Sequence, residues 1–173
     1  MDAQPVLALI AKALNTHRLE AVLIGNIAAA LHGAPVSTVD VDFCFRKTPT
    51  NLKKLKAVAQ SLDARILRPY YPLSSLYQLQ RDDHLQVDFM GHIDGIASFE
   101  SLRSRATRME IGGHPLLVAS LDDIIASKKA AGLALRKESD RALRDLIRRR
   151  LALPPEKRLN CLRKKIGLRA TCL

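Results

Sequence analysis

The stretch after the first twenty residues constrains the fold more than any other part of the chain. An apolar run over residues 21–24 predicts a buried strand that ends at Gly25. Residues 27–31 predict a short helix, which Gly33 would end. In residues 39–45 acidic and apolar side chains alternate at first, which is the period of a strand. Two strands linked by a short helix within 25 residues predict a sheet that is covered by helices.

The rest of the chain continues this alternation of helices and strands. Further strands are expected over residues 76–79, 85–90, 108–111 and 116–118, and further helices over residues 5–14, 48–62, 121–131, 137–151 and 156–166. Thr48 and Ser120 are typical helix N-caps, and the stretch over residues 112–115 predicts a hairpin turn. The predicted fold class is α/β (α+β), with a mixed β-sheet that is flanked by helices.

Positive charge is concentrated at the end of the chain. The net charge is +11 over 173 residues, of which residues 1–135 carry +2 and residues 136–173 carry +9. We therefore expect a near-neutral core over residues 1–135 and a basic helical extension over residues 136–173. The candidate nucleic-acid contacts are the clustered bases Arg148, Arg149, Arg150, Arg163, Lys164 and Lys165. Such clusters suit a phosphate backbone, although a solvated tail or a site for an acidic protein has the same composition.

Cysteine usage and hydropathy exclude several classes. Cys44, Cys161 and Cys172 are an odd number without CxxC spacing, which argues against a disulfide framework and favours a reducing, cytoplasmic setting. Polar and turn-forming residues interrupt the uncharged run over residues 21–39, so we expect no membrane partner.

Three acidic residues form the candidate catalytic and metal-binding group. Asp40 and Asp42 are two positions apart on one predicted strand, so their side chains share a face of that strand. Asp88 lies in another predicted strand and would join them if the two strands are neighbours. Carboxylates placed in this way suit Mg²⁺, which prefers oxygen ligands together with substrate phosphates. On sequence alone, an acid pair on a solvated strand face has the same pattern.

Gly25 and Asn26 form the candidate nucleotide-binding turn. They end the first predicted strand and precede a helix, where free backbone N–H groups and the helix dipole favour a phosphate. Gly25 would allow the backbone to approach closely, although an ordinary turn glycine has the same sequence signal.

These segments together resemble the nucleotidyltransferase superfamily that is related to DNA polymerase β. The resemblance rests on residues 24–26, on the acid–apolar–acid triplet over residues 40–42, and on the lysine-bearing helix over residues 121–132. It covers roughly residues 5–150. Leu31-His32-Gly33 followed by residues 37–42 resembles the small bacterial members, which are the minimal nucleotidyltransferases and the nucleotidyltransferase toxins of toxin–antitoxin pairs.

The resemblance implies Mg²⁺-dependent transfer of a nucleotidyl group from a nucleoside triphosphate such as ATP to a hydroxyl. Asp40 and Asp42 would hold the metal, and Asp88 would be the third ligand and the base. Gly25, Asn26 and Lys128 would bind the nucleotide. The implied partners are the triphosphate, an RNA acceptor such as a tRNA or else a protein, and a cognate antitoxin or helical partner protein.

Two residues depart from the family pattern. Asn26 stands where the family usually has Gly or Ser, and Val36 stands where many small relatives have an arginine. The alternative function is therefore a non-catalytic module of the same fold, which would bind nucleic acid or a partner protein through its basic C-terminal helices.

Overall fold

The computed structural model describes residues 3–34, 40–69, 76–82 and 85–132. Its named elements are α1 (Ala3–Thr16), β1 (Ala21–Ile24), α2 (Gly25–Leu31), β2 (Val41–Phe45), α3 (Pro49–Ser61), β3 (Arg65–Leu67), β4 (Tyr77–Gln80), β5 (Gln86–Met90), α4 (Phe99–Arg105), β6 (Thr107–Ile111) and β7 (His114–Val118). A further helix spans residues 121–132.

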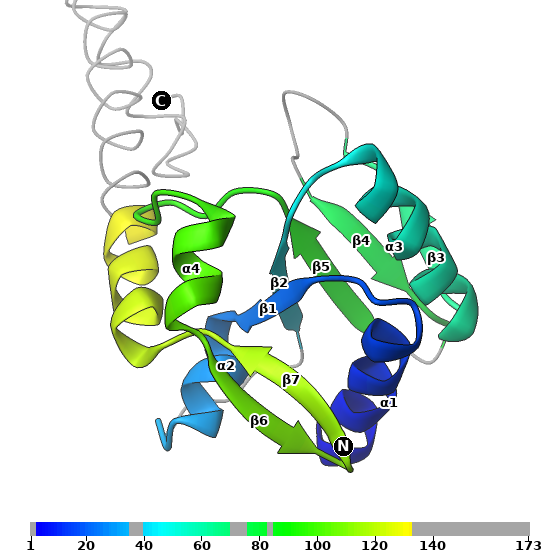
Figure 1. Ribbon diagram of the computed structural model, residues 1–173, viewed down its shortest axis with the longest axis horizontal. Helices are drawn as coiled ribbons and strands as arrows, with labels where there is room; N and C mark the ends of the chain where they lie inside the picture. The colour runs from blue at the N-terminus through cyan, green and yellow to red at the C-terminus, as the bar shows by residue number, and fades with distance from the viewer. Residues whose placement is uncertain (1–2, 35–39, 70–75, 83–84, 133–173) are drawn as a thin grey trace, which may run out of the picture. The chain divides into compact units, whose positions relative to one another are not determined.

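The strands form one mixed sheet in the order β3-β4-β5-β2-β1-β7-β6 (Figure 1). β1 is antiparallel to β2 and parallel to β7, whereas β2 is parallel to β5. Two antiparallel strand pairs, β3 with β4 and β6 with β7, extend the sheet at its ends. The predicted α/β class with a mixed sheet is confirmed.

The two faces of the sheet have different chemistry, because side chains alternate along β2 and β5. Phe43 and Phe89 stack on one face with their ring centroids 5.2 Å apart, and α3 packs on that face beside Tyr77. The opposite face carries Asp42 and Asp88, and further along β2 it is covered by α4. The apolar face therefore supplies much of the core, and the acidic face positions the candidate site.

Local sequence signals account for several element ends. The Thr48 side chain accepts a hydrogen bond from the Asn51 backbone N–H at 3.2 Å, as its N-cap role predicts. Gly112 and Gly113 both have positive φ, which a tight turn between β6 and β7 needs. Both predictions are confirmed, except that His114 and Pro115 belong to β7 and not to the turn.

Three features differ from the sequence-based expectation. β3 and α4 were not predicted, because β3 has only three residues and α4 only seven, too few for a clear period. β2 begins at Val41, so Asp40 immediately precedes the strand and is exposed. The predicted single strand over residues 39–45 is therefore too long at its start.

The basic C-terminal extension, the predicted domain boundary at residue 135 and Val36 lie outside the described residues. Within the described ranges, none of the helices combines the length and apolarity that a membrane span needs.

Candidate active site

The register of two central strands brings Asp42 and Asp88 side by side. β2 and β5 are parallel, and Asp42 pairs with Asp88 in that register. Paired residues of neighbouring strands point to the same face and lie about 5 Å apart at the backbone. The sequence predicted that Asp88 would join the acidic group if its strand neighboured the strand of Asp42. The two strands are neighbours, and the two carboxylates lie on the same part of the sheet.

Two glutamines hold the Asp88 carboxylate. Gln78 Nε2 donates to Asp88 Oδ1 at 3.0 Å, and Gln86 Nε2 donates to Asp88 Oδ2 at 3.2 Å. Asp88 itself is only 8% exposed. Neither glutamine was predicted from the sequence as a site residue. Gln86 could have been found, because it lies two residues before Asp88 on the same strand face, whereas Gln78 reaches the site only through the pairing of β4 with β5.

Asp42 carries an electrostatic cost in this position. Burial raises the pKa of the Asp42 carboxyl from 3.8 to about 6, and the negative charges of Asp88 and Asp40 act in the same direction. The Lys128 ammonium partly opposes this shift. Two neighbouring carboxylates therefore repel the Asp42 charge, and a cation of higher charge than a lysine would offset this repulsion.

Gly25 leaves the space that the Asp42 side chain occupies. A Cβ atom added at Gly25 would overlap Asp42 Oδ2 and would lie 3.1 Å from Asp42 Cγ. Gly25 also has a φ of +71°, which other residues rarely adopt. Two independent reasons, backbone conformation and close approach to a carboxylate, therefore require glycine where β1 meets α2.

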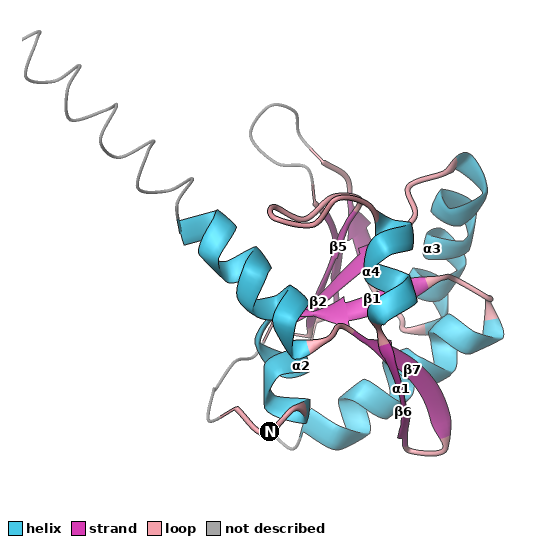
Figure 2. Cartoon of the chain, turned by 60° about the vertical axis from the view of Figure 1, so that its left-hand side comes forward, coloured by secondary structure: helices cyan, strands magenta, loops and turns pink. Residues whose placement is uncertain are grey.

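Lys128 reaches the strand–helix turn from a distant part of the sequence. Its Nζ donates to Asn26 Oδ1 at 2.5 Å, across 102 residues of chain. Helix 121–132, which carries Lys128, lies beside α2 (Figure 2). The structure therefore brings the three predicted nucleotide-binding residues, Gly25, Asn26 and Lys128, to one place next to Asp42.

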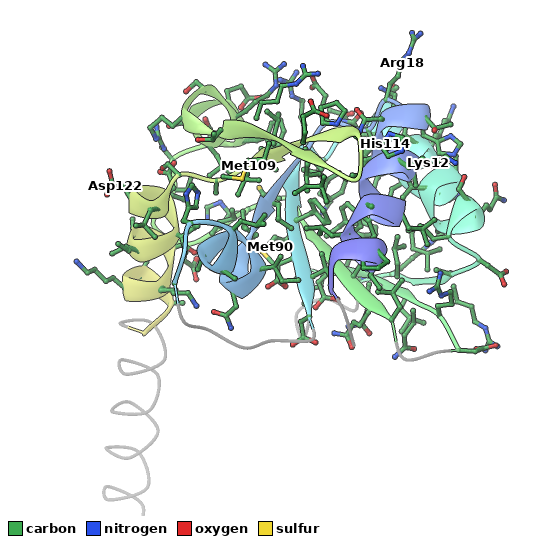
Figure 3. All side chains as sticks on the ribbon, turned by 90° about the horizontal axis from the view of Figure 1, so that it is seen from below. Lys12, Arg18, Met90, Met109, His114 and Asp122 are labelled. Atoms are coloured by element: carbon green, nitrogen blue, oxygen red, sulfur yellow. The ribbon has the colours of Figure 1, made fainter. Side chains whose placement is uncertain are left out.

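The start of the lysine-bearing helix is fixed by a buried acid. Arg105 of α4 donates to Asp123 through Nε at 3.1 Å and through Nη2 at 2.7 Å, and Ser120 Oγ donates at 2.8 Å. Burial alone would raise the pKa of Asp123, but these hydrogen bonds outweigh it and hold the pKa below its usual value. The neighbouring Asp122 points outward (Figure 3). These contacts tie helix 121–132 to α4.

Cys44 lies on the same strand face as Asp42 and is only 2% exposed. Burial raises the pKa of its thiol to about 12, and the nearby Glu100 charge adds to this. A thiol with this pKa stays protonated at neutral pH and is a poor nucleophile. Cys44 therefore fills space beside the site.

The donor atoms fit a hard divalent cation. Among the described residues no three His, Cys, Asp or Glu side chains already converge as a metal cluster. Asp42 and Asp88 nevertheless form an in-register carboxylate pair, and Asp40 is close enough to raise the pKa of Asp42. Mg²⁺ commonly takes one or two carboxylates and completes its shell with substrate phosphates and water. The six basic residues predicted as nucleic-acid contacts lie outside the described residues.

The fold and this acidic site define the class of protein. The sequence pattern of a family described as nucleotidyl transferase of unknown function (DUF2204) matches residues 4–166. The chain belongs to this nucleotidyltransferase family, which confirms the resemblance seen in the sequence. A comparison with curated proteins finds no match.

Solved structures of nucleotidyltransferases share the fold. A protein from Thermotoga maritima that is classed as a nucleotidyltransferase matches with a TM-score of 0.59 and 20% identity, over 84% of this chain and 92% of that chain. The antibiotic-resistance factor ANT(2'')-Ia matches with a TM-score of 0.51 and 20% identity, over 88% and 95%. Its complex with adenylyl-2''-tobramycin matches with a TM-score of 0.53 and 17% identity, over 88% and 100%. At these identities the likeness shows the fold alone.

Proposed function

We propose that this nucleotidyltransferase transfers a nucleotidyl group from a nucleoside triphosphate to a hydroxyl of RNA, in a Mg²⁺-dependent reaction. The observation that carries the proposal is the position of Asp42. It is paired with Asp88 across β2 and β5, and it touches the space that Gly25 leaves open at the start of α2. The carboxylates and the turn that we propose to bind the nucleotide thus meet at one point of the sheet.

In this proposal Asp40, Asp42 and Asp88 hold the metal. Mg²⁺ bound there would supply positive charge against the phosphate oxygens and would lower the cost of the mutual repulsion of the acids. The raised pKa of Asp42 and the carboxylates that raise it support this assignment.

The triphosphate is assigned to the turn between β1 and α2. Gly25 lets the backbone come close, and the Asn26 side-chain amide offers a hydrogen-bond donor to a phosphate oxygen. Lys128 donates a hydrogen bond to Asn26 Oδ1 and would place a positive charge beside the same phosphates. The Asn26–Lys128 contact gives asparagine a function at a position where the family usually has Gly or Ser.

The acceptor hydroxyl loses its proton as its oxygen bonds to the α-phosphorus and pyrophosphate leaves. Asp88 is proposed as the base, as well as a metal ligand. The amides of Gln78 and Gln86 hold its carboxylate in one orientation. A general base needs such a fixed orientation to accept the proton from the acceptor hydroxyl.

RNA is favoured as the acceptor by charge. The last 38 residues carry +9, and the clusters at residues 148–150 and 163–165 are proposed to bind the RNA backbone. A cationic small molecule, such as the tobramycin adduct found with ANT(2'')-Ia, would be repelled by the same charge. By resemblance to small bacterial members, we propose a tRNA end as one acceptor and a toxin–antitoxin setting for the reaction.

The test is labelling with each α-³²P nucleoside triphosphate in Mg²⁺, with total bacterial RNA, total protein and tobramycin offered in parallel. We expect label in RNA with the wild-type chain and with Asp94→Asn, an exposed control. We expect no label with Asp42→Asn. Label in protein or tobramycin alone would refute the RNA assignment. No label from a folded chain that binds RNA would support the non-catalytic module.

A further inference from the structure

A groove lies on the sheet face opposite the acidic site. It has a volume of about 330 Å³ and lies between α3 and the outer strands β3 and β4, at the side of the molecule where these elements meet in Figure 1. Tyr77 lines it, whereas the next residue, Gln78, points to the other face and binds Asp88. The groove and the acidic site are thus on opposite faces of one strand.

The rim of the groove is positively charged. Lys53 and Lys56 lie on successive turns of α3, and Arg68 follows β3. The described residues that line the groove include no Asp or Glu. Within the described part of the chain, no hydrogen bond or ion pair holds these three side chains. A fourth cation, the Lys47 ammonium, lies 5.8 Å from the centroid of the Tyr77 ring.

This charge is local and does not follow from a basic surface in general. Residues 1–135 have a net charge of only +2. The neighbouring hollow on β3 and β4, of about 370 Å³, has two acids, Asp63 and Asp82, around a single cation, Arg65. Arg65 is neutralised there by Asp82 at 3.3 Å. Of these two hollows, only the groove beside α3 has three bases and no acid.

The floor of the groove is apolar. Leu52, Ile66 and Tyr77 are half-buried and lie beneath the charged rim. An apolar floor under a cationic rim suits a ligand that has flat apolar faces and regularly spaced negative charges. A single-stranded nucleic acid has both, because its unpaired bases lie on apolar and aromatic surfaces while lysine and arginine contact its phosphates.

We propose that the groove formed by Lys53, Lys56, Arg68, Leu52, Ile66 and Tyr77 binds a single-stranded segment of RNA. Identifying this strand as the acceptor rests on the proposed function, but the binding itself does not. The residues of the groove are different from those of the C-terminal basic clusters, and the groove lies on the sheet face opposite Asp42 and Asp88. It would bind a part of the acceptor RNA that lies away from the hydroxyl that reacts.

Binding is measured without triphosphate or Mg²⁺, by the anisotropy of a 5′-fluorescein-labelled 12-nucleotide oligouridylate with the full chain. The test variant is Lys53→Gln/Lys56→Gln/Arg68→Gln. The control variant, Lys12→Gln/Arg108→Gln/Lys129→Gln, has the same net charge and alters exposed cations elsewhere, such as Lys12 on α1 (Figure 3).

We expect the test variant to bind at least about tenfold more weakly, because three phosphate contacts are lost. The slope of log affinity against log salt should fall by about 2, since each contact to a single strand contributes about 0.7. The control should change affinity less than about threefold. Equal losses in the two variants would overturn the proposal, because binding would then be a general effect of net charge.

Two further measurements keep the proposal falsifiable. In the wild-type chain, the oligonucleotide should protect Lys53 and Lys56 from acetylation more than Lys12, and equal protection would contradict a groove contact. A duplex of the same length should compete poorly. Equal competition by the duplex, or by an acidic peptide of the same charge, would overturn the single-strand assignment.

The same experiment separates this proposal from the proposed function. Asp42→Asn should bind the oligonucleotide like the wild-type chain while losing transfer. If no RNA is labelled by the wild-type chain but Lys53 and Lys56 are protected, the transfer proposal fails and the groove stands. If RNA is labelled, the groove variant should raise the KM for RNA and keep kcat.

Discussion

Replacing Asp42 by asparagine should stabilise the fold at neutral pH while it abolishes transfer. The carboxylate is partly buried beside Asp88, and its pKa in the folded chain is about 6 instead of 3.8. At pH 7 the folded state must therefore hold a charge that the unfolded chain carries more easily in water. The expected rise in the free energy of unfolding requires no new contact from the asparagine amide. It arises because asparagine has nearly the same shape as aspartate but carries no charge.

The magnitude follows from the pKa of Asp42. A rise from 3.8 to about 6 corresponds to about 3 kcal/mol at pH 7. Solvent reaches the partly exposed carboxylate, so screening reduces the expected gain to about 1–2 kcal/mol. With a urea dependence of about 2 kcal/mol per M, the unfolding midpoint of Asp42→Asn should rise by about 0.5–1 M.

The pH dependence tests the cause. The folded state binds the Asp42 proton more tightly than the unfolded state, so this carboxyl favours folding below pH 3.8. That contribution is lost as the pH rises through about 6. The stability gain of Asp42→Asn should therefore be complete above pH 6 and should nearly vanish near pH 4.

Urea unfolding at pH 4 and pH 7, without Mg²⁺, measures both values. Asp94→Asn is the control, because its side chain is 60% exposed and it should change stability at neither pH. The reasoning is refuted if Asp42→Asn is no more stable than the wild-type chain at pH 7, or if its gain is the same at both pH values. Such a result would mean that burial and Asp88 do not penalise the Asp42 charge.

Three shorter predictions concern neighbouring features. Gly25→Ala should destabilise the fold by about 1–3 kcal/mol in urea unfolding and should impair transfer, because its Cβ meets the Asp42 carboxylate and its φ is positive; an unchanged midpoint would contradict this. Lys128→Met should raise the KM for the triphosphate about tenfold or more in steady-state assays while the free chain keeps its melting temperature; an unaltered KM would remove Lys128 from the phosphate site. Thr48→Ala should cost about 1 kcal/mol of stability through the lost N-cap, whereas Thr48→Ser should cost little.

The acidic site could be predicted only in part, and the reason is the range of the interactions. Asp42 is recognisable from the sequence because its neighbours alternate over a few residues. The pairing of Asp42 with Asp88 could not be predicted from the sequence. The register of the two parallel strands depends on contacts between residues 46 positions apart, and no local pattern encodes such contacts. Gln78 was missed for the same reason: it reaches Asp88 from β4, a third strand of the sheet.

By itself the sequence determined most of the helices and strands, the mixed α/β class and several caps and turns, such as the Thr48 N-cap. These depend on hydrogen bonds and side-chain periods within one or two turns of chain. Only the tertiary structure decided which side chains meet. It brought Lys128 into hydrogen-bond contact with Asn26 and placed the Asp42 carboxylate where Gly25 has no side chain. It also formed the cationic groove on the sheet face opposite Asp42. These contacts arise from how distant segments pack, and packing is a property of the whole chain.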